Sequence, residues 1–220
     1  GALEEWAIRG DRIVVTNLAG RVTVGYAAGD RIVVRAERRG RDAGRLAFRV
    51  EEGGQAEFHV VYPLSEHRRY VYPELGSGSR TVLQEWPPKE GVSGLRALLQ
   101  LVTGRGIEIR GRPSGGALEA WADVEVLLPA GTPARVVLGA GPIEAAGVRA
   151  PLALRTRTGR VAVRDVVGDL DVDTGSGSVR VQGVRGSVRV DTGSGSVDVR
   201  EVEAPDGELY VDTGSGRVLG

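Results

Sequence analysis

The tetrapeptide Asp-Thr-Gly-Ser occurs three times near the end of the chain, beginning at Asp173, Asp191 and Asp212. The same tetrapeptide forms the catalytic turn of aspartic peptidases, whose chemistry needs two carboxylates about 3 Å apart that share one proton. Those enzymes bring the two carboxylates together from separate lobes or subunits. Here successive copies begin only 18 and 21 residues apart, each within a stretch of alternating apolar and polar residues. The pattern therefore predicts a parallel ladder of aspartates and disfavours an aspartic peptidase.

Other patterns that could do chemistry are weaker. The calcium-binding β-roll places its aspartate inside a Gly-Gly-x-Gly-x-Asp nonapeptide, whereas here the aspartate precedes the glycines and the period is longer. The two histidines, His59 and His67, form no zinc spacing or serine-histidine-acid constellation. His59 is expected to point outward from its strand. We predict no catalytic, cofactor-binding or metal-binding residues and no cofactor, and leave open whether a cation sits over the aspartates.

Composition and charge narrow the class of protein. The 220 residues carry 29 basic and 29 acidic side chains, so no overall field attracts nucleic acid or an anionic membrane surface. Without cysteine the chain has no disulfides and no thiolate metal site. No apolar run approaches the ~18 residues of a membrane span. The 34 glycines and the many valines indicate short strands joined by tight turns.

A short alternating unit that ends in glycine recurs along the second half of the chain. When the units are aligned on their final glycines, those glycines are 18, 16, 18 and 21 residues apart. They are Gly141, Gly159, Gly175, Gly193 and Gly214. A second alternating stretch follows each turn, with Val179, Val181 and Val184 inward in one copy, and no crossover helix intervenes. The irregular spacing predicts stacked β coils whose loops vary in length.

Stacking would place equivalent residues of successive coils about 4.8 Å apart. The alignment predicts an outward acidic column of Asp173, Asp191 and Asp212 that begins beside Arg157. Two further columns are Arg155–Asp171–Arg189–Tyr210, on the outer face, and Thr158–Thr174–Thr192–Thr213, expected to form a hydroxyl ladder beside the turn. Charges that alternate between neighbouring coils would fix their register.

The chain divides into three parts. Residues 1–62 contain short β runs and a hairpin around Gly53 and Gly54, and are expected to form N-terminal coils and a cap. Residues 63–116 break the pattern and read as an irregular insert with one short helix that begins near Ser93 and ends at Gly104. Residues 117–220 are expected to form regular repeat coils of the same single β-solenoid domain, and whether the coils continue beyond 220 is left open.

The insert also supplies the candidate partner-contact surface, because loops on a rigid scaffold often carry function and aromatic and arginine side chains dominate interfaces. Its residues are Arg68, Arg69, Tyr70, Tyr72 and Trp86. The competing interpretation is that the aromatic side chains pack the insert against the solenoid.

Three features in this order resemble a known family: the opening IVVTNLAGRVTVGYAAGDRIVVRA, the strand VEVLLPAG, and the repeated LDVDTGSGSVRV type of unit. Together they resemble the bacterial "putative adhesin" β-strand-repeat family, also called the Toastrack domain, over nearly the whole chain apart from 63–116. The resemblance implies a right-handed, parallel β-helix-like solenoid that is exported or displayed beyond a membrane. It brings no catalytic residues.

The sequence therefore favours a non-enzymatic scaffold or adhesin-like module of the bacterial cell envelope. It would bind protein partners, or itself, through the solenoid edges and the insert, with membrane contact only through a segment outside this sequence. The third motif copy stands next to Gly220, so the last coil is expected to meet more chain or a partner. The expected location is extracytoplasmic: periplasmic, cell-surface or membrane-anchored. The alternative is a carbohydrate-binding or carbohydrate-cleaving solenoid that uses Asp173, Asp191 and Asp212, with Tyr210 as a stacking platform.

Overall fold

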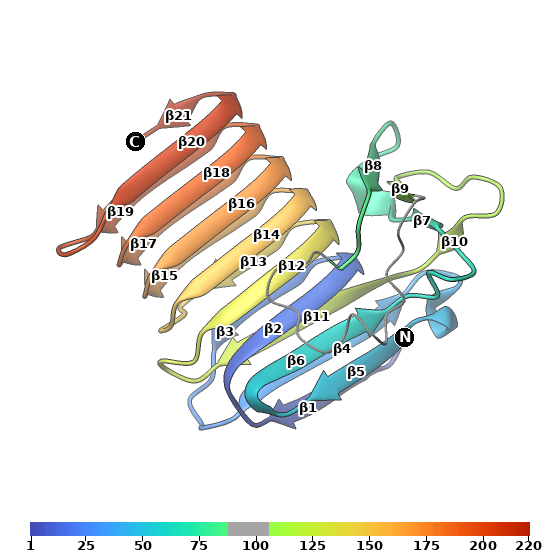
Figure 1. Cartoon of the computed structure of the whole chain (residues 1–220), viewed down its shortest axis with the longest axis horizontal. Coiled ribbons are helices and arrows are strands. Elements are labelled where there is room, and N and C mark those ends of the chain that lie inside the picture. The colour runs from blue at the N-terminus through green and yellow to red at the C-terminus, as the bar shows by residue number, and fades with distance from the viewer. Residues whose placement is uncertain (88–105) are drawn as a thin grey trace.

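The computed structural model describes residues 1–87 and 106–220, and nearly every element in these ranges is a strand. Two long sheets, called sheet A and sheet B below, lie face to face and form a stack of flattened coils (Figure 1). A small third sheet, sheet C, lies beside one end of the stack. The predicted all-β solenoid with an irregular insert is confirmed. The helix expected from Ser93 to Gly104 lies outside the described residues.

Each sheet has its own order of hydrogen-bonded neighbouring strands. In spatial order, sheet A contains β1 Leu3–Ile8, β4 Ile32–Arg39, β11 Trp121–Leu128, β3 Val22–Tyr26, β13 Ile143–Ala146, β15 Val161–Val167, β17 Val179–Arg185, β19 Val197–Glu203 and β21 Val218–Leu219. Sheet B contains β20 Leu209–Ser215, β18 Val188–Ser194, β16 Leu170–Ser176, β14 Leu152–Thr158, β12 Ala134–Ala140, β2 Gly10–Ala19, β6 Gly53–Val61 and β5 Ala47–Glu51. Sheet C contains β10 Leu118–Glu119, β7 Arg69–Val71, β9 Ile107–Arg110 and β8 Arg80–Leu83. Two 3-10 helices, η1 Ala43–Arg45 and η2 Pro73–Leu75, complete the described elements.

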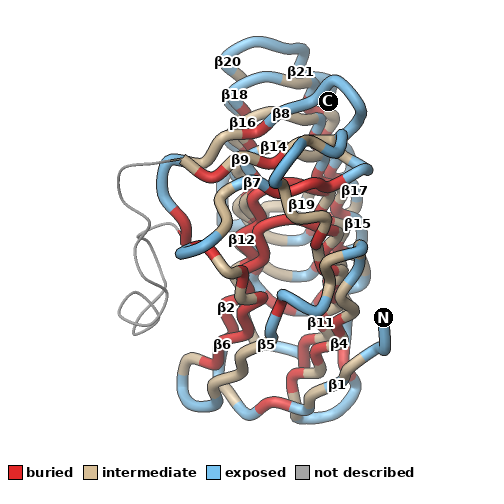
Figure 2. Tube along the Cα trace, turned by 90° about the vertical axis from the view of Figure 1, so that its right-hand side faces the viewer, coloured by how far each residue is buried: buried red, intermediate tan, exposed pale blue. Residues whose placement is uncertain are grey.

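Each regular coil supplies one strand to sheet B, a tight turn and one strand to sheet A. The alternating residues fill the space between the sheets, because successive side chains of a strand point to opposite faces. In β17, Val179, Val181 and Val184 are buried, while Arg180 and Gln182 are exposed, as the sequence predicts. The buried residues (red) follow the strands of both sheets along the stack in Figure 2. Parallel ladders join each coil to the next.

The tight turn depends on one glycine in each coil. Gly141, Gly159, Gly177 and Gly195 occupy this place, all with positive φ and spaced by 18 residues. A Cβ on Gly177 would overlap the carbonyl oxygen of Gly159 in the neighbouring coil. Only glycine permits both the backbone conformation and this close approach.

The predicted alignment is therefore wrong by two residues in its first two units. Each Gly-Ser-Gly segment contains two glycines, and the second one makes the turn, whereas the alignment used the first, such as Gly175. In the observed register Thr156, not Thr158, lies beside Thr174, and Arg155, not Arg157, lies beside Asp173. The coil length is constant as far as Gly195. The longer last step, to Gly216, comes from the loop 204–208 between β19 and β20.

The threonine column does not form the expected hydroxyl-to-hydroxyl ladder. Instead each hydroxyl donates to the carbonyl of the turn glycine in the preceding coil. The bonds are Thr156 to Gly141 (3.3 Å), Thr174 to Gly159 (3.2 Å), Thr192 to Gly177 (3.5 Å) and Thr213 to Gly195 (3.3 Å). These bonds tie neighbouring coils together at the turn.

The end of the stack near the N-terminus is closed by antiparallel strands. In sheet A, β4 pairs with both β1 and β11, and in sheet B β5 forms with β6 the hairpin predicted around Gly53. Trp6, Phe48 and Phe58 meet between the sheets, with ring centroids 5.1 to 5.6 Å apart. This end of the core is thus covered by aromatic rings.

The stacking order differs from the chain order. The strands β6 and β11 lie on the outer side of β2 and β3, and the described residues between them, 62–87 and 106–120, stand where regular coils have a tight turn. Sheet C is built from this segment, consistent with the irregular insert predicted from 63 to 116. The division into the ranges 1–62, 63–116 and 117–220 stays a prediction.

Candidate functional site

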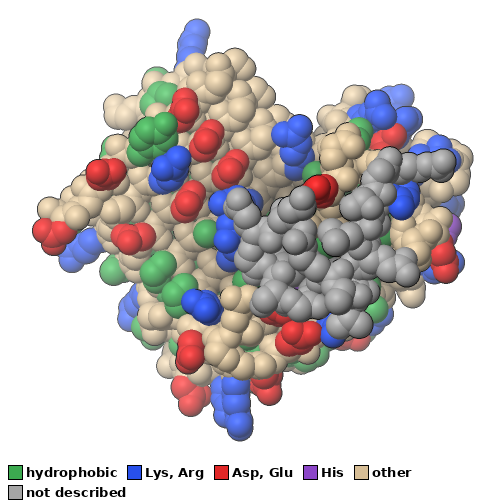
Figure 3. All heavy atoms as spheres, in the orientation of Figure 1, with side chains coloured by type: hydrophobic (Ala, Val, Ile, Leu, Met, Phe, Trp, Pro, Cys, Tyr) green, Lys and Arg blue, Asp and Glu red, His purple; other side chains and the backbone are tan. Residues whose placement is uncertain are grey.

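The outer face of sheet B carries two neighbouring rows of side chains, one residue from each coil. The row nearer the turns, which we call the aspartate row, runs Arg155, Asp173, Asp191 and Asp212. The other row, which we call the groove row, runs Arg135, Ala153, Asp171, Arg189 and Tyr210. The predicted outer column contained Arg155 in the place that Ala153 occupies, which follows from the two-residue misalignment. Acidic and basic side chains are interspersed over this face in Figure 3.

The three aspartates form the predicted ladder. Asp173 pairs in register with Asp191, and Asp191 with Asp212, so their side chains leave the same face of one sheet from adjacent strands. Burial raises the pKa of the Asp173 carboxyl, and the nearby Asp191 raises it further, while Arg155 acts in the opposite direction. A row that points one way differs from a peptidase dyad, and also from the two carboxyl groups that flank the scissile bond in glycosidases.

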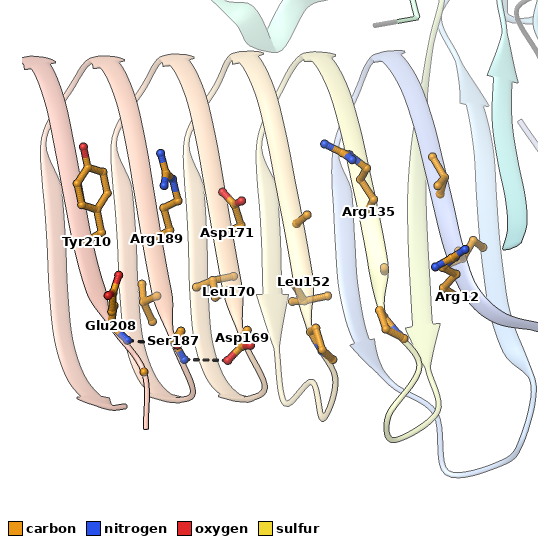
Figure 4. A pocket seen from close by; sticks show the side chains of 18 of the residues that line it. Arg12, Arg135, Leu152, Asp169, Leu170, Asp171, Ser187, Arg189, Glu208 and Tyr210 are labelled. Carbon is orange, nitrogen blue, oxygen red and sulfur yellow. Dashed lines mark hydrogen bonds between the residues drawn. The ribbon is translucent and has the colours of Figure 1, made fainter. Parts of the chain in front are cut away.

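Beside the aspartate row lies a groove with a volume of about 890 Å³. It follows the groove row and the residues just before each strand, and it crosses the strands of sheet B at right angles to the coils (Figure 4). Its lining residues include Arg12, Pro133, Arg135, Pro151, Ala153, Asp169, Asp171, Ser187, Arg189, Glu208 and Tyr210. The groove is thus built by equivalent positions of successive coils.

Several lining residues are held by contacts of their own. The guanidinium carbon of Arg189 lies 4.8 Å from the centre of the Tyr210 ring, a cation–π contact between neighbouring coils. The backbone N–H of Ser187 donates to the Asp169 carboxylate (2.9 Å), and the Glu208 N–H donates to the Ser187 hydroxyl (3.3 Å). The last two bonds fix the loops at the rim, so the shape of the groove is preformed.

The three aromatic residues of the predicted contact surface are buried, so they do not form a surface. Tyr70, Tyr72 and Trp86 have exposed fractions of 0%, 1% and 4%. The ring of Tyr70 packs edge-on against Tyr62 at 5.2 Å, and Tyr72 packs against Trp121 at 5.9 Å. Burial raises the pKa of both tyrosine hydroxyls. These rings fasten sheet C to the stack, which is the competing interpretation drawn from the sequence.

The two arginines of that predicted surface remain on the outside. Arg69 is exposed and Arg68 is partly exposed, on and beside β7. They lie apart from the groove lining. The structure therefore does not bring these two arginines to the aspartates. Trp86, in contrast, lines a smaller hollow of about 240 Å³ together with Arg155 and Asp173.

His59 lies on the outer side of β6, as expected, but it is buried there. Its Nδ1 lies 2.6 Å from the Thr16 hydroxyl, and its Nε2 lies 3.7 Å from a Glu57 carboxylate oxygen. Burial lowers the pKa of His59 to about 4 and raises the pKa of Glu57 to about 7. Alternation in AEFHVV places both residues on the outer side of β6, and no local signal predicts that this part of the face is covered. His59 and Glu57 thus form a buried polar contact and not an accessible site.

Within residues 1–87 and 106–220, no group of three or more histidine, cysteine or acidic side chains is arranged to hold a metal ion. In the same ranges no helix has the length and apolarity needed to cross a membrane.

No family profile matches the sequence, and no curated protein matches it. Among solved structures, one similar chain is a "putative cell adhesion protein" from Clostridium sporogenes. It shares 10% sequence identity with this chain, with a TM-score of 0.42, and the match covers 96% of this chain and 99% of the other.

Proposed function

We propose that the chain is a non-enzymatic, adhesin-like interaction module of the cell envelope that binds its partner across the outer face of sheet B. The groove beside the aspartate row carries this proposal. It combines a preformed hollow of about 890 Å³ with charged and aromatic side chains that the core does not require. The proposed location is extracytoplasmic.

The scaffold suits binding because the coils themselves do not depend on the side chains of the groove row. Parallel ladders and buried valines hold each coil, so outward positions such as Asp171 and Arg189 are free to follow the partner rather than the fold. Recognition is thus separated from stability, as in other repeat proteins with extended binding surfaces.

The insert and the sheet edges have a smaller part in this proposal than the sequence suggested. The aromatic side chains of the insert are used in packing, which leaves Arg68 and Arg69 as its candidate contacts. At the edge strand β20, Leu209 and Tyr210 have exposed fractions of 54% and 45%. Tyr210 belongs to both the edge and the groove, so a partner in the groove would also cover part of this edge.

The test is saturable binding of the purified chain to bacterial envelope preparations, measured before and after proteinase treatment and before and after periodate oxidation of glycans. A double variant of the groove row, Asp171→Ala with Arg189→Ala, should abolish saturation. Arg180→Ala on β17, an exposed arginine on the opposite sheet, is the matched control and should bind normally. Envelope binding that is absent, or unchanged in the groove variant, refutes the proposal.

A further inference from the structure

The shape of the groove on sheet B indicates an elongated ligand. The groove crosses β2, β12, β14, β16, β18 and β20, and adjacent strands lie about 4.8 Å apart, so it is roughly 24 Å long. Equivalent positions repeat at each step. A polymer with repeating units fits such a site better than one compact small molecule.

The floor of the groove offers little to a peptide main chain. The strands β2 to β18 beneath it are joined to both neighbours by parallel ladders, which occupy their backbone N–H and carbonyl groups. Among the described strands of the groove floor, only β20 has a free edge, and a strand added there would run along the coil and not along the groove. A peptide that adds a strand needs a free sheet edge. A ligand in the groove must therefore be recognised by side chains.

The charges along the groove come close to balance. Its charged lining residues are Arg12, Arg135, Arg189, Asp169, Asp171, Asp206 and Glu208. A polyanion such as a nucleic acid is bound by a clear excess of positive charge, which this set lacks. Hydroxyl groups, in contrast, can donate to a carboxylate and accept from a guanidinium side by side, and such charge-assisted bonds are the strong ones.

Apolar surface lies between these charged groups. Pro133, Pro151 and Ala153 line the middle of the groove, and the Tyr210 ring stands at its end with an exposed fraction of 45%. Figure 4 shows Tyr210, Arg189 and Asp171 side by side on successive strands. The C–H faces of a sugar ring pack on such patches while its hydroxyl groups reach the charged neighbours.

We propose that the groove binds an extended, uncharged oligosaccharide. Asp171 accepts from its hydroxyl groups, Arg189 donates to them, and Tyr210 packs against one ring. This inference rests on the proposed function, because it names the ligand class of the same site. The proposal concerns binding only, and no covalent bond of the oligosaccharide is formed or broken.

The experiment probes the whole chain with an immobilised panel of uncharged and acidic glycans, followed by titration calorimetry with cellohexaose, chitohexaose and hexagalacturonate. Asp171→Asn removes one charge at nearly constant size and should weaken binding about ten-fold. Ala153→Arg fills the groove without removing any polar group and should abolish binding. Arg180→Ala should bind like the wild type, and circular dichroism should show all three variants folded.

Binding to an uncharged glycan that both groove variants weaken supports the proposal. Preference for hexagalacturonate, or no binding to any uncharged glycan on the panel, overturns it. If the envelope binding survives periodate but not proteinase, the ligand class is wrong while the proposed interaction function stands. If both assays fail, both proposals fall.

Discussion

Replacing the turn glycine Gly177 by alanine should be among the most destabilising single changes in the regular coils. The residue has a φ of +141°, and an added Cβ would overlap the carbonyl oxygen of Gly159. A non-glycine residue in such a sparsely populated conformation costs about 1–3 kcal/mol. Forcing stacked backbones apart adds about 1–3 kcal/mol, the usual cost of overpacking. Together these costs give an expected total loss of about 4 kcal/mol.

Gly53 is the matched control for this change. Its φ of +144° is close to that of Gly177, but a Cβ there would meet nothing within 4 Å. Gly53→Ala should therefore show only the conformational cost of about 1–3 kcal/mol. The two variants thus separate backbone strain from the close approach of the coils.

Urea unfolding measures both losses, provided that the slope with denaturant concentration stays the same in all three proteins. Thermal unfolding gives a second reading, with about 2–4 °C expected for each kcal/mol in a chain of this size. Equal losses for Gly177→Ala and Gly53→Ala would refute the idea that coil contact, and not φ alone, demands glycine at the turn.

Three further predictions concern other positions of the coils. Glu201 has a φ of +54°, and the equivalent residues of the two preceding coils, Asp165 and Gly183, also have a positive φ. Glu201→Gly should therefore stabilise the fold by about 0.5 kcal/mol, which would be measured as a higher melting temperature. The pKa of Asp173 is raised in the folded state, so ionisation of this carboxyl opposes folding. Asp173→Asn should therefore stabilise the protein at pH 7, and the gain should disappear below the ordinary pKa near 3.8. Urea unfolding at pH 3 and pH 7 measures this difference. A lower stability of this variant at pH 7 would contradict the sign. Thr192→Val keeps the shape of a fully buried side chain but removes its bonds to the carbonyls of Gly177 and Ser194, and should cost about 1 kcal/mol in the same assay.

Local pattern was enough to predict the coils. Alternation along β16 and β17 identifies both the strands and their inward faces, because a strand with one buried face must alternate. The Gly-Ser-Gly segment defines the turn only to within two residues, since either glycine accepts a positive φ. The choice depends on contact between coils, as at Gly177 and Gly159, which a single unit of the repeat does not contain.

The contacts made by the insert could not be predicted in the same way. Tyr70 and Tyr72 are buried against Tyr62 and Trp121, and the second of these partners lies far along the chain. Exposed and buried tyrosines look alike in an irregular segment. The groove was missed for a related reason: with Arg155 assigned to the place of Ala153, the sequence showed an unbroken charged column instead of a hollow.

The placement of β6 and β11 outside β2 and β3 has a consequence for how the protein is made. In sheet A, β3 pairs with β11 and β13. This early strand therefore has no pairing partner until the whole of the insert has left the ribosome. Closing so large a loop is slow, and this step should set the pace of folding. Every coil after β13, in contrast, has its template ready as it emerges. The later coils can therefore be added or lost in whole repeats of 18 residues, each altering the length of the stack by about 4.8 Å, without disturbing the closure on which the fold depends.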